Sequence, residues 1–360
     1  MIRSGVQTSR GISPGAHIVA TGLRCAVGLT AASASAAIRA SISRVTEHPF
    51  FLDAIGDKVC CASEPSIDPT AEGSDRMVQL AKLCLRDIAQ KLKAANAWPK
   101  DATVLLALPE PRPGFSPGHA IQLQHALTSS LIPETTTVHI KCVGEGHAGA
   151  LSALSMAVAL VSSGQQELVV VGGVDSYLEA STLGWLDAQR RLARTNIRSG
   201  FSPGEGAALM AVASDATCNR LGLHSLARVR GIACTQERRD PASDTGLLGE
   251  ALGEAVLGAA SDLSLPEEVI TDTYGDINGE LARSHDWGFA VMRTATCFRD
   301  GTDYVTSAGQ CGDLGAATGA LGCILATEAW SFHRAHGPRA LVWAASWGGL
   351  RGAVLLEQAV

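Results

Sequence analysis

Two segments of the chain show the same order of glycine, small and apolar residues. The first runs from Val143-Gly-Glu-Gly-His-Ala-Gly through Ala, Leu, Ser and Met to Leu168-Val-Val-Val-Gly-Gly. The second runs from Cys311-Gly-Asp-Leu-Gly-Ala-Ala through a similar stretch to Leu341-Val-Trp-Ala-Ala-Ser-Trp-Gly-Gly. The middle stretches lack a charged face, which predicts helices buried on all sides. The apolar runs that follow predict central strands of a covered sheet.

The repeat predicts one supersecondary unit used twice in an α/β protein. Two buried helices at the middle of the molecule imply a five-layer α-β-α-β-α sandwich. We expect two similar halves, residues 1–215 and 216–360, that form one pseudo-twofold globular unit. The hydrophobic content of 46% is sufficient for a core of that size.

Further segments resemble the thiolase superfamily and, within it, the β-ketoacyl synthases. His17-Ile-Val-Ala-Thr-Gly-Leu is similar to the first strand and turn of a ketosynthase, Ala36-Ala-Ile-Arg-Ala-Ser to its first helix, and Asp75-Arg-Met-Val-Gln-Leu-Ala to the helix that follows. Gly200-Phe-Ser-Pro-Gly-Glu-Gly-Ala-Ala closely resembles the family's Gly-Phe-x-Pro-Gly-Glu-Gly-Ala box. The resemblance covers nearly the whole chain and implies the duplicated thiolase fold.

The same resemblance indicates that the catalytic residues of the family are replaced. His147 stands where the family has its nucleophilic cysteine, at the start of the first buried helix, and Tyr274 stands for the first catalytic histidine. Asp313 stands for the second histidine, and Ala308 for the lysine before it. Condensation needs a thiolate nucleophile and two donors that stabilise the enolate. We therefore expect no ordinary condensing activity.

The replacements leave two interpretations open. In a pseudo-twofold thiolase fold His147 is expected near Asp313, with Tyr274 close by. A histidine oriented by a carboxylate can act as a general base, which would give an acyltransferase or thioester hydrolase of acyl-CoA or acyl carrier protein. Alternatively, the polar groups satisfy one another where a site has decayed, because buried polar groups need partners. The chain would then be an accessory, adaptor or partner subunit, like the chain-length factors.

Two other segments contribute candidate binding residues. Ser346-Trp-Gly-Gly-Leu resembles the family turn whose backbone N–H supplies half of the oxyanion hole, so Trp347 and Gly348 are candidates. Trp347 would take the place of the gating phenylalanine, or would fill an unused cavity. A basic cluster comprises Arg190, Arg191, Arg194 and Arg198. It could bind the phosphate of phosphopantetheine or coenzyme A, or an acidic carrier protein. Alternatively, it could be a salt-bridged loop.

Other chemistry is weakly indicated. The ten cysteines are scattered as in a cytoplasmic protein with reduced thiols, and we expect Cys142 and Cys311 to be structural. Glu205 is expected to be a buried structural carboxylate. We expect no metal site and no cofactor, because no ligand spacing is present. The net charge of −6 argues against nucleic-acid binding, and the sequence predicts neither a signal peptide nor a membrane span.

The resemblance also suggests partners. We expect a homodimer, or a heterodimer with an active relative, formed by edge-to-edge pairing of the strand Glu167–Val171. The loop Pro109–Gly118 is rich in proline and glycine and is a candidate contact surface. Asp276-Ile-Asn-Gly-Glu280 with Trp287 is similar to thiolase-like proteins encoded with bacterial type VI secretion components. That similarity implies an adaptor role in loading secreted effectors.

Overall fold

The computed structural model describes residues 15–68, 70–99, 101–130, 137–194, 197, 199–240 and 246–359. Its strands are β1 (Ala16–Cys25), β2 (Thr46–Leu52), β3 (Lys58–Cys61), β4 (Asp101–Leu108), β5 (Thr137–Glu145), β6 (Leu168–Ser176), β7 (Glu205–Ser214), β8 (Ala227–Gln236), β9 (Asp272–Tyr274), β10 (Arg339–Ala345) and β11 (Leu350–Gln358). Its helices are α1 (Ala31–Arg39), α2 (Gly73–Ala94), α3 (Pro117–Ser130), α4 (Gly149–Ser162), α5 (Ala180–Ala188), α6 (Asp215–Leu221), α7 (Glu250–Ala259), α8 (Leu281–Arg293), α9 (Ala308–Cys311) and α10 (Thr318–Ser331). Two 3-10 turns, η1 (Ala295–Cys297) and η2 (Gly315–Ala317), complete the described elements.

Nine strands form one sheet in the order β5-β4-β6-β7-β1-β8-β11-β10-β9, and β2 and β3 form a separate hairpin. β1 pairs with β8 only from Ala16 to Ile18. The sheet therefore divides at this point into a first half, β5 to β1, and a second half, β8 to β9. The predicted division between residues 215 and 216 falls at the start of α6, which lies between β7 and β8 along the chain.

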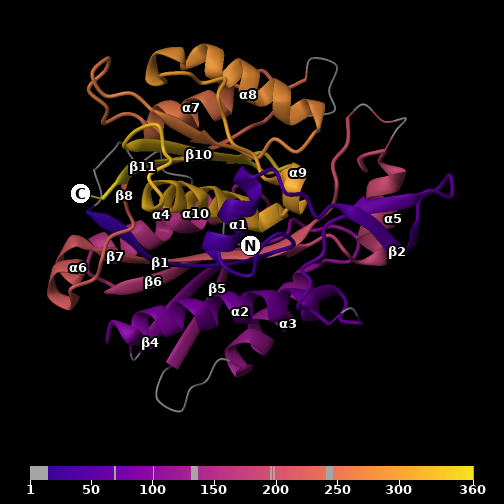
Figure 1. Cartoon of the computed structure of the whole chain (residues 1–360), viewed down its shortest axis with the longest axis horizontal. Coiled ribbons are helices and arrows are strands. Elements are labelled where there is room, and N and C mark those ends of the chain that lie inside the picture. The colour runs from indigo at the N-terminus through magenta and orange to yellow at the C-terminus, as the bar shows by residue number, and fades with distance from the viewer. Residues whose placement is uncertain are drawn as a thin grey trace.

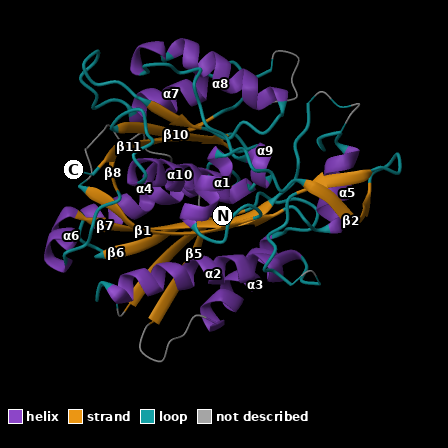
Figure 2. Cartoon of the chain, in the orientation of Figure 1, coloured by secondary structure: helices purple, strands orange, loops and turns teal. Residues whose placement is uncertain are grey.

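The layers confirm the predicted five-layer sandwich. Figure 1 shows α7 and α8 outside the second half of the sheet, α2 and α3 outside the first half, and α4 and α10 between the two. Figure 2 shows the same alternation of helical and strand layers. Both central helices are rich in Ala and Leu, and they pack in one core with β6, β7 and β10. Small residues allow this close packing, since a Cβ on Gly319 of α10 would lie 3.1 Å from the carbonyl oxygen of His147.

The expectation about the pairing edge is wrong. The strand that follows α4 is β6, and it lies between β4 and β7, so neither of its edges is free. Its unbroken apolar run is typical of a central strand, because both of its faces are covered. The free edge of the first half is β5, which pairs only with β4 among the described strands.

The predicted surface loop Pro109–Gly118 is also anchored more deeply than its composition suggested. Arg112 pairs with the buried Asp175, and Phe115 is buried in the core. The helix α3 already begins at Pro117. Only part of this loop, including Pro111 and Pro113, is exposed to solvent. Among the described residues, no helix is long and apolar enough to span a membrane.

Replacing Gly173 with alanine tests the close approach of β6 to the start of α10. An added Cβ would lie 1.9 Å from the carbonyl oxygen of Ala316, and backbone atoms in a packed core cannot move aside cheaply. We expect Gly173→Ala to lower the free energy of unfolding by about 2 kcal/mol or more in urea titrations.

The matched control is Gly184→Ala on the exposed side of α5, where the added Cβ would meet nothing within 4 Å. There the better helix propensity of alanine should raise stability by about 0.5–1 kcal/mol. Equal effects of the two substitutions would contradict the tight packing at Gly173.

Candidate functional site

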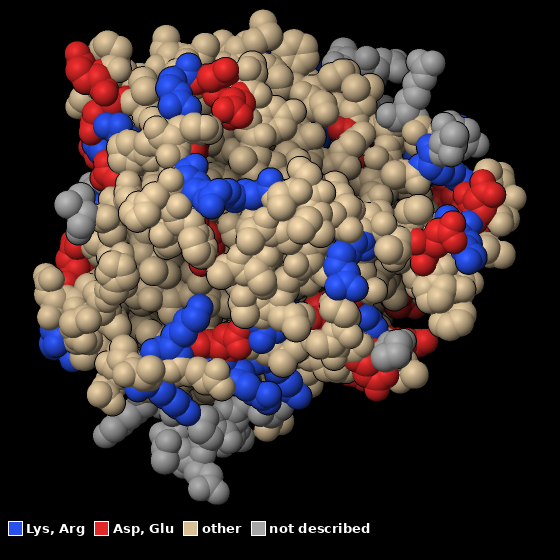
Figure 3. Space-filling model, in the orientation of Figure 1, with Lys and Arg blue, Asp and Glu red and all other residues tan. Residues whose placement is uncertain are grey.

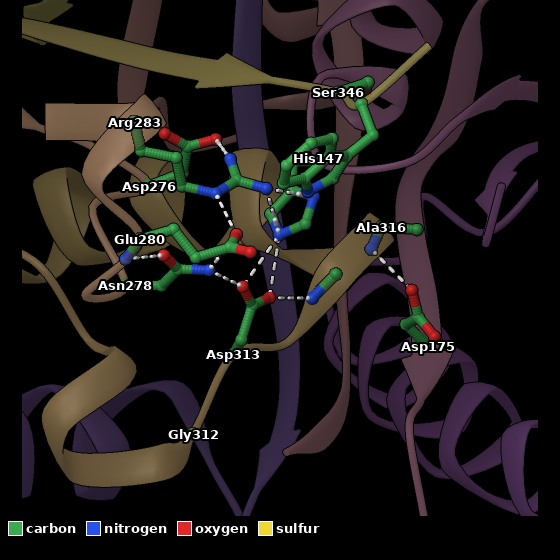
Figure 4. A network of polar contacts seen from close by, with 12 residues as sticks. His147, Asp175, Asp276, Asn278, Glu280, Arg283, Gly312, Asp313, Ala316 and Ser346 are labelled. Atoms are coloured by element: carbon green, nitrogen blue, oxygen red, sulfur yellow. Dashed lines mark hydrogen bonds and ion pairs between the residues drawn. The ribbon is translucent and has the colours of Figure 1, made fainter. Parts of the chain in front are cut away.

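His147 lies at the start of the first buried helix, in the position predicted for the missing nucleophile. The chain turns from β5 into α4 through Gly144 and Gly146, whose φ angles of +73° and +68° are readily adopted only by glycine. This turn places the imidazole at the centre of the molecule, where His147 is only 2% exposed. His147 Nε2 lies 2.8 Å from Oδ1 of Asp313 and 3.0 Å from Oδ2. Figure 4 shows the two side chains facing each other.

Asp313 is held in the turn between α9 and α10. Its Oδ1 accepts a hydrogen bond from the backbone N–H of Gly315 at 2.7 Å, and its Oδ2 accepts one from Asn278 Nδ2 at 2.5 Å. Burial alone would raise the pKa of this carboxyl. His147, Arg283 and the Gly315 N–H outweigh that effect and hold its pKa well below its usual range. Asp313 is therefore a buried, fully partnered carboxylate.

Arg283, in the first turn of α8, is the cation at the centre of the network. Its Nη2 lies 3.1 Å from Nδ1 of His147 and 3.2 Å from Nε2. Its Nη1 donates to Asp276 and to the carbonyl oxygen of Ala345, and its Nε donates to Glu280 at 3.3 Å. One guanidinium thus binds groups from three separate parts of the chain (Figure 4).

The segment from Asp276 to Glu280, between β9 and α8, supplies the remaining polar groups. Asp276 also accepts the backbone N–H of Ala345 at 2.7 Å. Glu280 accepts a hydrogen bond from Arg191 at 2.7 Å and one from Asn278 at 3.1 Å. Burial opposes ionisation of Glu280, yet Arg283 and Arg191 keep its pKa below its ordinary value. Three carboxylates thus share two guanidinium groups, Asn278 and His147.

One assignment of protons gives each ring nitrogen of His147 a partner, although the contact of Arg283 with Nε2 at 3.2 Å is then not a hydrogen bond. If the ring proton is on Nε2, it is donated to Asp313, and the lone pair on Nδ1 accepts a hydrogen bond from Arg283. Both ring nitrogens then have protein partners. A general base needs a free lone pair that faces the substrate, and this arrangement leaves none.

Tyr274 does not join this network. It lies at the end of β9 and packs in the central core, close to Gly322 of α10. No hydrogen bond links Tyr274 to His147 or Asp313 among the described contacts. Burial raises the pKa of its hydroxyl well above the usual value, so the phenol stays protonated at neutral pH. The structure brings together two of the three predicted site residues and leaves Tyr274 to one side.

The turn at Ser346, Trp347 and Gly348 is occupied by a side chain of the protein itself. The backbone N–H of Trp347 donates to a carboxylate oxygen of Glu110 at 3.0 Å, and the N–H of Gly348 donates to the other oxygen. Ser346 Oγ accepts the backbone N–H of Ala148 at 3.0 Å, at the start of α4. The N–H groups predicted to hold a substrate oxygen therefore already bind Glu110.

The indole of Trp347 covers the guanidinium of Arg191 next to this turn. The guanidinium of Arg191 lies 4.0 Å from the centre of the indole ring and about 5.5 Å from that of Phe201. The cavity that borders Trp347 and Arg283 has a volume of about 20 Å³. That space holds about one water molecule and no acyl chain. Among the described residues, the indole of Trp347 thus fills space beside Arg191 and Arg283.

Comparison with known proteins supports the fold and leaves the chemistry open. Residues 146–218 match the model of the β-ketoacyl synthase N-terminal domain. The ishigamide ketosynthase/chain length factor superposes with a TM-score of 0.78 at 14% identity, over 96% of this chain and 99% of that chain. A chain from AntDE:AntF, a type II polyketide synthase acyl-carrier protein in complex with its ketosynthase, gives 0.77 at 13% identity, over 96% and 99%.

A third match comes from a modular enzyme. The ketosynthase of module 6 of the bacillaene synthase from Bacillus subtilis 168 gives a TM-score of 0.75 at 12% identity, over 96% of this chain and 72% of that chain. The sequence matches none of the curated proteins with which it was compared. At these identities the superpositions establish architecture.

The chain has the thiolase-like ketosynthase fold. In this ketosynthase fold the first buried helix, α4, follows His147 and the second, α10, follows Asp313, as the sequence predicted. Cys142, the neighbouring thiol, lies on β5 opposite Leu106, and burial raises its pKa to about 11. Cys311 is fully buried behind Asp313. Both placements agree with the prediction that these cysteines are structural, which stays a prediction.

The basic cluster is divided among several roles in this ketosynthase fold. Arg190 is exposed in the turn after α5. Arg194 pairs with Asp53 at 2.8 Å and with Asp187 at 2.7 Å, so its charge is already balanced. Arg191 belongs to the central network, and Arg198 lies outside the described residues. Among the described members of the cluster, Arg190 is the one whose side chain is exposed and has no ion pair in the structure.

Glu205, in the glycine-rich box, is the buried structural carboxylate that the sequence predicted. It is fully buried and accepts two hydrogen bonds from Arg76, at 2.5 and 2.7 Å. Ser176 Oγ and the backbone N–H of Glu64 occupy its remaining positions. No group of residues that could hold a metal ion is present in the described part of the chain.

Sequence reasoning missed the residues that close the site. Arg283 and Glu110 were not identified, although Glu280 and Arg283 stand three residues apart after a strand, which is the spacing of a helical ion pair. The segment Asp276–Glu280 was noted for its similarity to other proteins and not for its carboxylates. A dense run of polar residues directly after a buried strand was the available signal.

The depressed pKa of Asp313 predicts how acid affects stability. A carboxyl whose folded pKa is below its unfolded value, about 3.9, stabilises the fold above that value and loses this contribution as the pH falls toward the folded pKa. We expect Asp313→Asn to be about 3 kcal/mol less stable than the wild type at pH 7. The difference in the free energy of unfolding between wild type and Asp313→Asn should narrow below about pH 4.

Urea unfolding followed by tryptophan fluorescence between pH 7 and pH 3 measures this difference. Asp303→Asn, at an exposed position, is the control and should track the wild type throughout. A gap between wild type and Asp313→Asn that stays constant with pH would contradict the proposed state of Asp313.

Proposed function

We propose that this chain is a non-condensing protein with the ketosynthase fold that acts as an accessory or partner subunit. The observation that carries the proposal is the closed network at the position of the nucleophile. There His147 is buried, and both of its ring nitrogens have partners in Asp313 and Arg283. A site with no thiolate and no free donor pair cannot hold an acyl group or stabilise an enolate.

Acyl transfer or thioester hydrolysis by His147 is not favoured. A base would need a free nitrogen that faces the substrate, and both ring nitrogens of His147 have partners among the described residues. Glu110 also occupies the N–H groups of Trp347 and Gly348 that would receive the oxyanion. An anionic carboxylate held there would repel the negative charge that develops in such a reaction.

A partner subunit needs a surface for association, and one edge of β5 is unpaired among the described strands. An exposed edge presents unpaired N–H and C=O groups that favour pairing with another strand. We propose that β5 pairs with the same strand of a second copy, or with that of a related ketosynthase. The comparison with a ketosynthase/chain length factor is consistent with such an assembly.

The link to type VI secretion stays a prediction. It rests on the sequence of Asp276–Glu280, whose polar residues in this chain build the buried network. Because those residues are buried, they would support an adaptor by holding its centre together. Any contact with an effector would be made by other residues on the surface.

The non-condensing role predicts that the protein stays unmodified by acyl donors. Incubation with acetyl-, malonyl- and longer acyl-coenzyme A should give no adduct in intact-protein mass spectra and no release of free coenzyme A above the His147→Ala background. His285→Ala, at an exposed histidine on α8, is the matched control. Turnover that is lost in His147→Ala and kept in His285→Ala would overturn the proposal.

The proposed pairing predicts a dimer whose β5 amides are protected. In a monomer only the amides that face β4 are bonded, so alternate N–H groups of residues 137–145 should exchange rapidly with deuterium. In a dimer paired at this edge the outward amides should also be protected, and dilution should release them. The interior strand β6 should stay protected at every concentration.

Sedimentation analysis and hydrogen–deuterium exchange at several concentrations measure both properties. A monomer at all concentrations, or a dimer in which the outward amides of β5 exchange rapidly, would contradict pairing through this edge.

A further inference from the structure

The hairpin formed by β2 and β3 projects from the sandwich at one end of the molecule (Figure 1). Its pairing is interrupted between Glu47 and Leu52. Within that interruption Nδ1 of His48 accepts the backbone N–H groups of Phe50 at 3.2 Å and Phe51 at 2.9 Å. This contact fixes a bulge that turns Phe50 outward, where it is 87% exposed.

The hairpin is held rigidly against α5. Asp53, at its tip, pairs with Arg194 at 2.8 Å and accepts the backbone N–H groups of Ile55 and Asp57. The backbone N–H of Ala54 donates to Asp187 of α5 at 2.7 Å. The surface beside the hairpin is therefore preformed, which lowers the entropy cost of binding.

Between the bulge, the start of α2 and α5 lies a cavity of about 380 Å³. Its size falls within the roughly 300–1,000 Å³ of ordinary ligand pockets. Phe50, Phe51, Leu178 and Leu183 provide apolar walls, and Arg76 lies at its border with its charge balanced by Glu205. The cavity can accept one or two bulky apolar side chains.

The charges around this cavity are mostly negative. Glu47 and Glu72 line it, and Asp68 and Asp75 lie close by along the chain. Among the described residues Glu47 pairs with Lys58 at 3.2 Å, in an exposed pair that contributes little. Figure 3 shows acidic side chains gathered at the lower right of the view, below the lobe that carries β2 and α5. An occupant with positive charge beside its apolar group would be favoured.

We propose that this cavity is a docking site for a partner-protein segment in which a bulky apolar side chain is flanked by lysine or arginine. The apolar side chain enters between Phe51 and Leu183, and the basic residues face Glu47 and Glu72. Phe50, exposed at the bulge, packs against the bound segment. An aromatic or aliphatic anchor in a preformed pocket is the usual centre of such an interface.

The inference rests on the proposed accessory role, since a subunit without chemistry acts through its surfaces. The cavity is lined by other residues than those of the His147 network. The two proposals can therefore fail separately. Acylation assays decide the accessory role, and peptide binding decides the docking site.

The test is selection from a random peptide display library on the immobilised full-length chain, followed by fluorescence polarisation with the selected peptides. Ala180→Phe fills the cavity from the start of α5, and Ala188→Phe, exposed at the other end of that helix, is its control. Glu72→Lys reverses a charge at the cavity, and Glu254→Lys on α7 is its control.

The selected peptides should share a bulky apolar residue next to lysine or arginine. Ala180→Phe should weaken their binding by roughly tenfold or more. Glu72→Lys should weaken it several-fold and reduce its dependence on salt. Both control variants should bind like the wild type. Absence of a shared sequence, a shared acidic sequence, or equal binding to Ala180→Phe would overturn the docking site, whatever the acylation assays show.

Discussion

The balance of buried charge around Arg283 is the constraint on which the centre of the molecule depends. Two helix starts meet between the halves of the sheet, and the carboxylates beside them are shielded from water. An isolated buried carboxylate would cost several kcal/mol, so each one needs a cation or several donors. Arg283 supplies contacts to Asp276 and Glu280 and, through His147, to Asp313. Without this side chain, the three carboxylates would share Arg191, His147, Asn278 and backbone N–H groups.

The same contacts join layers that are far apart in sequence. Arg283 comes from the outer helix α8, and Ala345 from the end of β10. At the start of α10 a second carboxylate, Asp175 from β6, accepts the N–H of Ala316 at 3.0 Å and pairs with Arg112. Negative groups at a helix start are favourable, because the peptide dipoles point their positive end there. Residues that the sequence predicts to replace a catalytic set thus contribute to cohesion between the halves.

The sequence was most informative where a pattern was long and repeated. The paired helix and strand units predicted α4, β6, α10 and β10, and the pseudo-twofold relation predicted that His147 would meet Asp313. Orientation at the end of a short strand was not predictable, so Tyr274 was assigned to the site although its ring packs in the core. Long side chains were equally hidden. Arg283 and Glu110 reach the site from distant segments, and only the folded chain shows where their charged ends lie. The free edge at β5 likewise depends on strand order, which local periodicity does not determine.

Closure of the site and exposure of the hairpin are two consequences of how this chain distributes its polar groups. At the centre, the donors and acceptors of His147 and Asp313 have partners elsewhere in the described part of the chain, which supports the proposed structural role of this site. At the β2–β3 hairpin the polar side chains bind backbone N–H groups, since His48 fixes the bulge and Asp53 fixes the tip. Phe50, Leu52 and Ile55 of the hairpin are exposed, and the contact with His48 holds Phe50 in solvent. A fixed and exposed aromatic residue beside an apolar cavity is expected at a recognition surface, whereas a fully matched polar cluster is expected in a structural core.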